Sequence, residues 1–138
     1  MKVLIRKVNH SDYLGVIDLY NEYNNKNIMY HDISSYDFKK IIVAEAEGKI
    51  IACAEINILN NEIENYKYSY ITNLCIKKKY QSDSVIKLLF QAIEKITIQQ
   101  KCKKIILDIS IKQQFETYKK INFKKTDSIN LIKDLESN

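Results

Sequence analysis

The stretch YITNLCIKKKYQSDSVIKLLFQAIEKITIQQ, residues 70–100, decides the fold of this chain. Residues 70–76 are mainly apolar or β-branched, which is typical of a strand, and residues 77–80 form a polar turn. Apolar side chains then recur with the period of one helix face, at Val85, Ile86, Leu88, Leu89, Ala92, Ile93 and Ile96. The stretch therefore predicts a strand, a tight turn and a long helix at 83–100, with Ser82, Asp83 or Ser84 as its cap.

The start of this helix is a candidate anion-binding site. The first N–H groups of a helix have no partner within the helix, and the positive end of the helix dipole lies beside them. Ser82 and Ser84 add hydroxyl donors, whereas Asp83 brings a negative charge that nearby lysines offset in part. We expect this turn to bind phosphate mainly through its backbone.

The rest of the chain alternates between strand and helix patterns. Before the stretch quoted above we expect a strand at 3–8, a helix capped by Ser11, and a short helix at 33–40 capped by Asp32 or Ser34. A hairpin of 41–46 and 49–59 that turns at Gly48 should follow, and then a polar connection at 60–67. After the stretch we expect a strand at 105–109, a short helix at 112–120, and one or two closing strands within 123–135. A helix joins the strands at 70–76 and 105–109, so these two should be parallel neighbours. The predicted fold class is α/β, with a mixed sheet that is otherwise antiparallel and has helices on both faces.

Composition narrows the class of protein. A chain of 138 residues suits one domain, 1–138, with one sizeable core. The net charge of +5 comes from lysines spread along the whole chain, so it does not indicate an acidic partner. Neither a signal peptide nor a membrane span is expected, because no apolar run approaches the ~18 residues that a span needs. We therefore expect a cytoplasmic protein with no membrane partner.

The metal-ligating residue types are few and scattered. Three cysteines, Cys53, Cys75 and Cys102, have no C-x-x-C spacing and are expected to be reduced thiols. His10 and His31 have no Cys or carboxylate at ligand spacing. We expect no metal site.

Three segments share patterns with one known family. Residues 43–50, VAEAEGKI, match the pattern VAE-x-x-G-K-I of a hairpin. Residues 81–86, QSDSVI, align with [RQ]-x-x-G-x-[GA]: Gln81 is kept, and Ser84 and Ile86 replace small residues. Residues 117–123, TYKKINF, resemble F-Y-x-K-x-G-F. Together, and in this order, they resemble the GNAT superfamily of acyl-CoA-dependent N-acetyltransferases over nearly the whole chain.

The resemblance implies a function and a set of site residues. It implies that acetyl-CoA, as co-substrate, lies between the splayed strands 70–76 and 105–109, and that a primary amine of a small molecule or peptide accepts the acetyl group. Tyr118 matches the family's acid, which protonates the leaving thiolate. The resemblance places acetyl-CoA binding at Leu74, Cys75, Ile76, Gln81, Ser82, Asp83, Ser84, Val85 and Ile86. Small members of the family often form homodimers, so a homodimer is expected.

The general base has no clear candidate in the sequence. Many family members carry Glu where this chain has Thr72, and Thr does not accept a proton at neutral pH. The remaining candidates are expected to be solvated surface groups, and a chain of waters can replace them: Glu55, Glu62, Glu64 and His31.

Two other functions remain alternatives. The chain can be a GNAT-fold binding or regulatory module that has lost acetyl-CoA binding, because four positions depart from the family pattern: Thr72, Asp83, Ser84 and Ile86. It can also be a nucleic-acid binder through the lysines at 77–79 and 101–104. No aromatic residues are interleaved there at a stacking spacing, so nucleic acid is not an expected partner.

Overall fold

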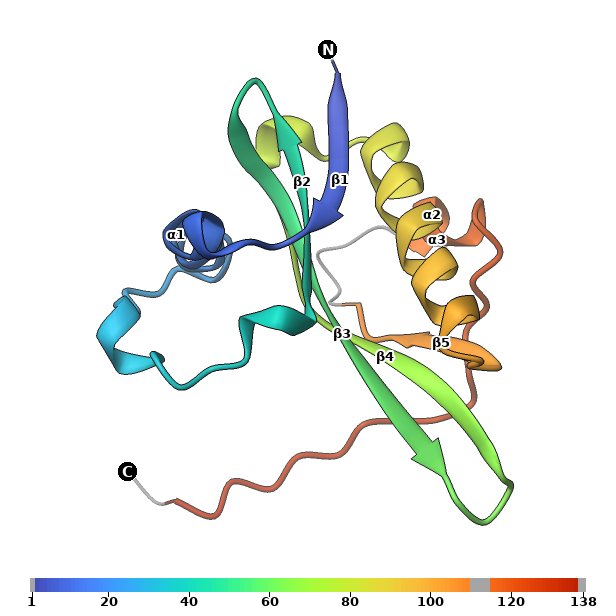
Figure 1. The fold of residues 1–138 in the computed structure, drawn as a ribbon. Helices are drawn as coiled ribbons and strands as arrows, with labels where there is room; N and C mark the ends of the chain where they lie inside the picture. The colour runs from blue at the N-terminus through green and yellow to red at the C-terminus, as the bar shows by residue number, and fades with distance from the viewer. Residues whose placement is uncertain (1, 110–114, 137–138) are drawn as a thin grey trace.

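The structure is a computed structural model, and it describes residues 2–109 and 115–136. Five strands form one sheet in the order in which they occur along the chain (Figure 1). Its strands are β1 (Val3–Lys7), β2 (Ile41–Ala46), β3 (Lys49–Asn61), β4 (Tyr66–Ile76) and β5 (Lys104–Leu107). All neighbouring strands are antiparallel except β4 and β5, which are parallel. The α/β class, the mixed sheet and its single parallel pair are as predicted.

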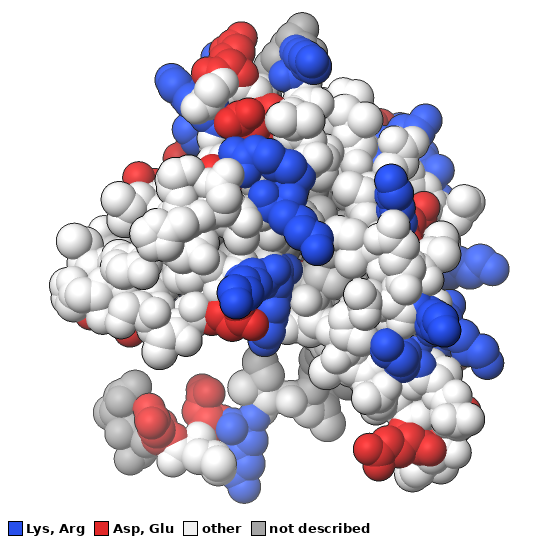
Figure 2. All heavy atoms as spheres, in the orientation of Figure 1, with Lys and Arg blue, Asp and Glu red and all other residues white. Residues whose placement is uncertain are grey.

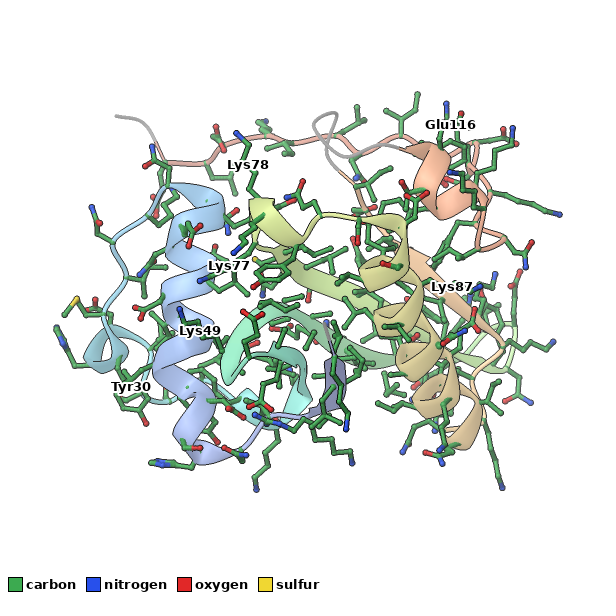
Figure 3. The ribbon with its side chains drawn as sticks, turned by 90° about the horizontal axis from the view of Figure 1, so that it is seen from above. Tyr30, Lys49, Lys77, Lys78, Lys87 and Glu116 are labelled. Carbon is green, nitrogen blue, oxygen red and sulfur yellow. The ribbon has the colours of Figure 1, made fainter. Side chains whose placement is uncertain are left out.

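Helices cover both faces of the sheet. Helix α1 (Tyr13–Asn24) lies on one face, and α2 (Asp83–Gln99) and α3 (Phe115–Lys119) lie on the other (Figure 1). A view from above shows α1 and α2 on opposite sides of the strands (Figure 3). The apolar stripe of α2 is buried against the sheet through Val85, Ile86, Leu89 and Ile93, as its spacing predicts. Two positions differ: Leu88, predicted to face the core, is 40% exposed, and Phe90, which the spacing did not include, is buried. No helix in the described part of the chain is long and apolar enough to cross a membrane.

The α1 face has a core of its own. Val16, Ile17 and Leu19 of α1 pack with Phe38 and with the β2, β3 and β4 side chains Ile41, Val43, Cys53 and Cys75. Tyr13 stacks on Phe38 with ring centroids 4.0 Å apart, which fixes the segment after α1 against the helix. The segment between α1 and β2 therefore forms a wall beside the sheet.

Two predictions for the first forty residues are wrong. Ser11 does not cap α1, because a 3-10 turn, His10–Asp12, precedes the helix. Asp12 is the residue that precedes α1, and its carboxylate makes no capping bond to this helix; it accepts the Asn9 N–H at 2.8 Å and is held by Arg6 at 2.6 Å. In place of the short helix expected at 33–40 there is one 3-10 turn, Phe38–Lys40, and another, Tyr30–Asp32, lies before this range.

The β3–β4 hairpin is longer than predicted. Residues expected to form a polar connection at 60–67 instead extend both strands, and only residues 62–65 turn. The Asn61 side chain accepts the Glu64 N–H at 3.1 Å, and Asn65 adopts a φ of 57°. Asn tolerates this left-handed conformation, so the turn forms without glycine. The hairpin end lies outside the core and thus needs no apolar alternation.

The closing strands expected within 123–135 are absent from the described residues, which form no strand after β5. Ile129, Leu131, Ile132 and Leu135 are 83%, 91%, 88% and 87% exposed. Their apolar pattern favours an extended chain, but a strand also needs a partner ladder, and the segment runs away from the sheet (Figure 1). The helix expected at 112–120 is present as α3, although residues 112–114 lie outside the described part.

Candidate active site

A gap opens in the sheet where β4 and β5 diverge. Their pairing runs from Tyr68 with Lys104 to Ile71 with Leu107, whereas β4 continues to Ile76. A cavity of ≈ 270 Å³ lies at this point. Residues of β4, of the end of α1 and Asp108 line it: Tyr23, Asn24, Tyr70, Ile71, Thr72, Asn73, Leu74, Cys75 and Asp108. The gap lies between the two strands where the family resemblance places the co-substrate, and that assignment stays a prediction.

A β-bulge shapes the β4 side of the gap. Cys53 pairs with Cys75 and Glu55 with Thr72, so two β4 residues, Asn73 and Leu74, lie opposite a single residue of β3. Asn73 takes a φ of 51°, which Asn tolerates better than most side chains. A bulge leaves its extra residue outside the strand ladder, so backbone N–H groups become available to a ligand.

The predicted β4 ligands can act only through their backbone. The side chains of Leu74, Cys75 and Ile76 are 9%, 0% and 4% exposed and belong to the two cores. The backbone at the bulge nevertheless borders the gap. Any contact of these three residues with a ligand therefore depends on the bulge and not on side-chain identity.

The turn before α2 holds its own shape. Ser82 is the helix cap, since its hydroxyl accepts the Val85 N–H at 3.4 Å. Gln81 donates from its amide to the Ile76 carbonyl at 3.1 Å and so ties the turn to the end of β4. The Ser82 and Ser84 hydroxyls lie 3.1 Å apart on the exposed side. Lys77 and Lys78 lie on this turn, and Lys87 lies on α2 (Figure 3).

Two side chains that depart from the family pattern are turned away from an anion at this helix start. The Asp83 carboxylate lies 2.7 Å from the Lys120 ammonium and accepts the Thr117 hydroxyl at 2.9 Å. The hydrogen bond from Lys120, and then that from Thr117, hold the pKa of Asp83 below its usual range. Ile86 is 9% exposed and packs in the core. The charge of Asp83 is therefore compensated, and the bulk of Ile86 is buried.

Tyr118 is a buried residue of α3 and belongs to the core between the helices and the sheet. It is 3% exposed and makes edge-to-face contacts with Phe90 and Phe123 at centroid distances of 5.8 and 6.1 Å. Burial, with a smaller contribution from Tyr23 of α1, raises the pKa of Tyr118 to about 12. Tyr23 lines the gap from the α1 face of the sheet. At neutral pH the Tyr118 phenol carries a proton and can donate it.

A second cavity, ≈ 200 Å³ in volume, lies between α1, the segment after it and the sheet. Apolar and aromatic side chains line it almost entirely, with Glu55 and Asn73 as polar exceptions: Val16, Ile17, Tyr20, Ile28, Ile33, Tyr36, Phe38, Ile41, Cys53, Ala54, Glu55 and Asn73. We name it the α1 cavity.

Glu55 is the charged group of the α1 cavity, and the expectation that it is a solvated surface group is wrong. It is 8% exposed and accepts hydrogen bonds from the Tyr36 hydroxyl, from the Thr72 hydroxyl at 2.9 Å and from the Asn73 amide at 3.1 Å. Asn57 in turn donates to Thr72 at 2.8 Å, which directs the single Thr72 hydrogen toward Glu55. The other base candidates, Glu62, Glu64 and His31, are exposed as expected.

The gap and the α1 cavity share one wall. Asn73 lines both, and the register partners Cys53 and Cys75 line one each. Both cysteines are free and buried, and the hydrogen bond to Cys75, together with burial, raises the pKa of Cys53 well above its usual value. The same hydrogen bond lowers the pKa of Cys75. The wall is therefore a partition of buried side chains with the bulge at its edge.

Comparison with known proteins identifies the family. The chain matches the acetyltransferase (GNAT) family over residues 7–123. It belongs to the GNAT family. Glucosamine-6-phosphate N-acetyltransferase from Arabidopsis thaliana is similar in structure, with a TM-score of 0.77, 22% identity, and coverage of 99% of this chain and 100% of that one. Ribosomal-protein-alanine N-acetyltransferase from Brucella melitensis biovar Abortus 2308 gives a TM-score of 0.81 at 12% identity, with coverage of 96% and 100%.

A third similar structure contains the co-substrate. It is a predicted acetyltransferase from Clostridium acetobutylicum with acetyl-CoA, with a TM-score of 0.74, 17% identity, and 96% of each chain covered. At these identities the likeness shows the shared GNAT fold. The GNAT family match thus agrees with the strand gap, the bulge and the capped helix start described above.

The residues present fit acetyl-CoA. A capped helix start with exposed serine hydroxyls and nearby lysines suits a pyrophosphate, and the gap between β4 and β5 suits a narrow chain. The one nearby acidic side chain of the helix start, Asp83, is already paired. Nothing in the described turn places an uncompensated negative charge or an apolar side chain across this path.

Proposed function

We propose that this protein transfers the acetyl group of acetyl-CoA to a primary amine of a small molecule or peptide. The observation that carries the proposal is the gap between the diverging strands β4 and β5, bordered by the β4 bulge. Tyr118 of α3, a protonated phenol with a pKa of about 12, is the proposed proton donor. A proton donor and a bulged backbone are the two groups that thioester aminolysis needs at its reacting atoms. Membership of the GNAT family supports the same reaction class.

The proposed binding roles follow the geometry. Backbone N–H groups of Ser82, Asp83 and Ser84 and the serine hydroxyls bind the pyrophosphate. The N–H groups of Val85 and Ile86, which the sequence also assigned to this site, already donate to the Ser82 hydroxyl and carbonyl at 3.4 and 3.2 Å, so these two residues shape the turn. Gln81 holds the turn to β4. The backbone of Leu74 and Cys75, which line the gap, borders the acetyl end of the co-substrate, and Ile76 follows them at the end of β4.

The reaction begins with the acceptor amine, which is protonated at neutral pH. Glu55, bonded to Asn73 at the edge of the partition, accepts one ammonium proton. The freed nitrogen lone pair forms the C–N bond at the acetyl carbonyl, and bulge N–H groups donate to the oxygen as charge develops there.

Tyr118 completes the reaction. As the C–S bond breaks, its electron pair leaves on the sulfur, and the Tyr118 phenol donates its proton to that thiolate. The remaining extra proton on nitrogen passes through water to the phenolate, and Glu55 releases its proton to solvent. The products are the N-acetyl amine, free coenzyme A and one proton.

The experiment that tests the proposal is titration calorimetry with acetyl-CoA, followed by chromatographic detection of coenzyme A with a panel of primary amines. We expect saturable binding by the parent protein, and turnover with at least one amine. Binding without turnover for any amine class would favour the binding-module alternative. No heat at all would show that the gap does not accept the co-substrate and would end the enzymatic proposal.

We further propose a homodimer. The C-terminal segment exposes four large apolar residues, and β5 is a short edge strand. Light scattering at micromolar concentration is expected to give twice the chain mass of 16.3 kDa. A monomeric mass at every concentration would contradict this proposal.

A further inference from the structure

We infer that the acceptor is a small primary amine with an apolar body, whose ammonium group is bound by Glu55 inside the α1 cavity. This inference rests on the proposed function but concerns the acceptor alone. Its evidence is a buried carboxylate at the end of an otherwise apolar cavity, next to the bulge where the acetyl carbonyl must lie.

The cavity has the size and lining for one hydrocarbon group. Its volume is ≈ 200 Å³. An apolar protein cavity of about 150 Å³ is enough to bind benzene. The α1 cavity therefore accepts one ring, or an alkyl chain of similar size, with a short arm ending in the amine. Tyr36 and Phe38, in edge contact at 4.9 Å between centroids, supply aromatic surface to that body.

Glu55 lacks a positive partner within the described residues. Its three donors, Tyr36, Thr72 and Asn73, are all neutral, and no Lys, Arg or His of residues 2–109 and 115–136 forms an ion pair with it. A buried carboxylate is costly without a positive partner, and an ammonium ion supplies one. A carboxylate offers about four lone-pair positions, of which three are taken, so one remains for the substrate.

The donors also orient the carboxylate. Thr72 is bonded to Oε1, whereas Tyr36 and Asn73 are bonded to Oε2, so both oxygens are fixed. Thr72 and Asn73 belong to the bulged part of β4 and also line the gap. An ammonium group on Glu55 is therefore held beside the bulge, at the edge of the partition where the α1 cavity and the gap meet.

The same lining selects against other amines. A sugar amine or a polyamine would bury hydroxyl or further ammonium groups against side chains that offer them no partner. The lobe formed by α1 and the segment after it also carries few charged side chains on the face shown in Figure 2, whereas lysines are spread over the rest of that face. A highly charged acceptor has no complementary surface there.

The test compares binding of matched ligands without acetyl-CoA. Titration calorimetry on the full chain uses 2-phenylethylamine, its neutral analogue 2-phenylethanol, and glucosamine. We expect 2-phenylethylamine to bind at least tenfold more tightly than glucosamine. Glu55→Gln is expected to weaken 2-phenylethylamine at least tenfold and to leave 2-phenylethanol within twofold, because only the amine loses a charge partner. Glu62→Gln, on the exposed hairpin turn, is the matched control and should change neither.

A second variant tests the cavity independently of Glu55. Ile33 is half-buried at the cavity wall, and Ile33→Phe fills part of the space. We expect this change to weaken 2-phenylethylamine at least tenfold and propylamine by less than threefold. A uniform loss for both amines, or tighter binding of glucosamine than of 2-phenylethylamine by the parent, would overturn the inference.

The outcome is separable from that of the proposed function. Glu55-dependent binding of the apolar amine, without acetylation of any amine, would refute the transferase and leave the amine site standing. Acetylation of glucosamine or of a peptide, with the apolar amine inert and unbound, would refute the amine site and leave the transferase standing.

Discussion

The two ligand sites that we propose on either side of the β4 bulge differ in the groups that they offer. On the co-substrate side, the start of α2 and the bulge offer backbone N–H groups from one short stretch of chain, and the side chains there cap, pair or pack. On the acceptor side, Glu55 is held by side chains from the segment after α1 and from β4, 17 to 19 residues distant in sequence. Backbone recognition tolerates changes in sequence, whereas side-chain recognition does not. Ser84 and Ile86, which depart from the family pattern, lie at the start of α2, where recognition depends on the backbone and tolerates such changes.

The largest expected effect is a loss of turnover when the proposed proton donor is removed. Tyr118→Phe removes the proton donor while keeping the ring that packs against Phe90 and Phe123. We expect kcat to fall by about 100-fold or more, since general acid catalysis contributes ~10²–10⁴-fold. Acetyl-CoA affinity should stay within about twofold. Tyr66→Phe, on the β3–β4 hairpin, is the control and should leave kcat unchanged.

Steady-state kinetics with calorimetry on the same preparations checks this prediction. If Tyr118→Phe retains full turnover, the phenol is a packing residue only. If it loses acetyl-CoA binding instead, then the ring hydroxyl positions the co-substrate and the proton comes from elsewhere.

The same phenol predicts a loss of stability at high pH. Below about pH 10 the phenol is protonated in both folded and unfolded chains. Between about 10 and the folded pKa of about 12, the unfolded chain ionises first, so stability falls as pH rises. Two pH units correspond to about 2.7 kcal/mol. Urea unfolding at several pH values should show a steeper decline for the parent than for Tyr118→Phe, and equal slopes would contradict the buried, protonated phenol.

Most of the fold could be predicted because its signals are local. The helical period of residues 83–99 and the apolar run at 70–76 identify α2 and β4, and the helix between two strands requires their parallel arrangement. Ser11 failed as a cap because the Arg6–Asp12 pair comes from a strand and a turn that only folding brings together. The prediction of C-terminal strands was wrong because a preference of the residues for extended backbone does not supply a neighbouring strand to pair with.

The two halves of the site differ in the same way. The helix start and Tyr118 are read from short motifs, so sequence locates them. Glu55 was missed as a buried group because its three donors come from separate segments. One signal was available: Glu55 follows Ile51 and Cys53 at alternate positions of a strand that is buried on both faces, where a carboxylate is rare.

Asn73 lines both the gap and the α1 cavity, so its substitution should affect both sites. Its φ of 51° is strained for most side chains, and a left-handed residue costs ~1–2 kcal/mol when Asn or Gly is replaced. Asn73→Ala should lower the free energy of unfolding by about that amount and also weaken the α1 cavity ligand. Asn73→Gly keeps the bulge and removes only the donor to Glu55. Chemical denaturation measures the free energy of unfolding of both variants and so separates the loss of the bulge from the loss of the donor. Equal stability of the Ala and Gly variants would argue against a bulge.

The smallest change is expected for Asp83, the residue that looks most unfavourable for acetyl-CoA binding in the sequence. Asp83 stands at the proposed pyrophosphate site, yet Lys120 and Thr117 hold its carboxylate on the α3 side. Asp83→Asn keeps an acceptor for Thr117 and removes one charge, and it leaves Lys120 without its partner. Because exposed ion pairs are worth little and salt screens them, we expect acetyl-CoA binding to tighten by less than about tenfold, and by less still as salt increases. Calorimetry at low and high salt measures the gain in acetyl-CoA affinity and its dependence on salt. Asp127→Asn, in the exposed C-terminal segment, is the control. A gain of a hundredfold would mean that the Asp83 charge acts directly on the pyrophosphate, and that the co-substrate side depends on side chains as much as the acceptor side does.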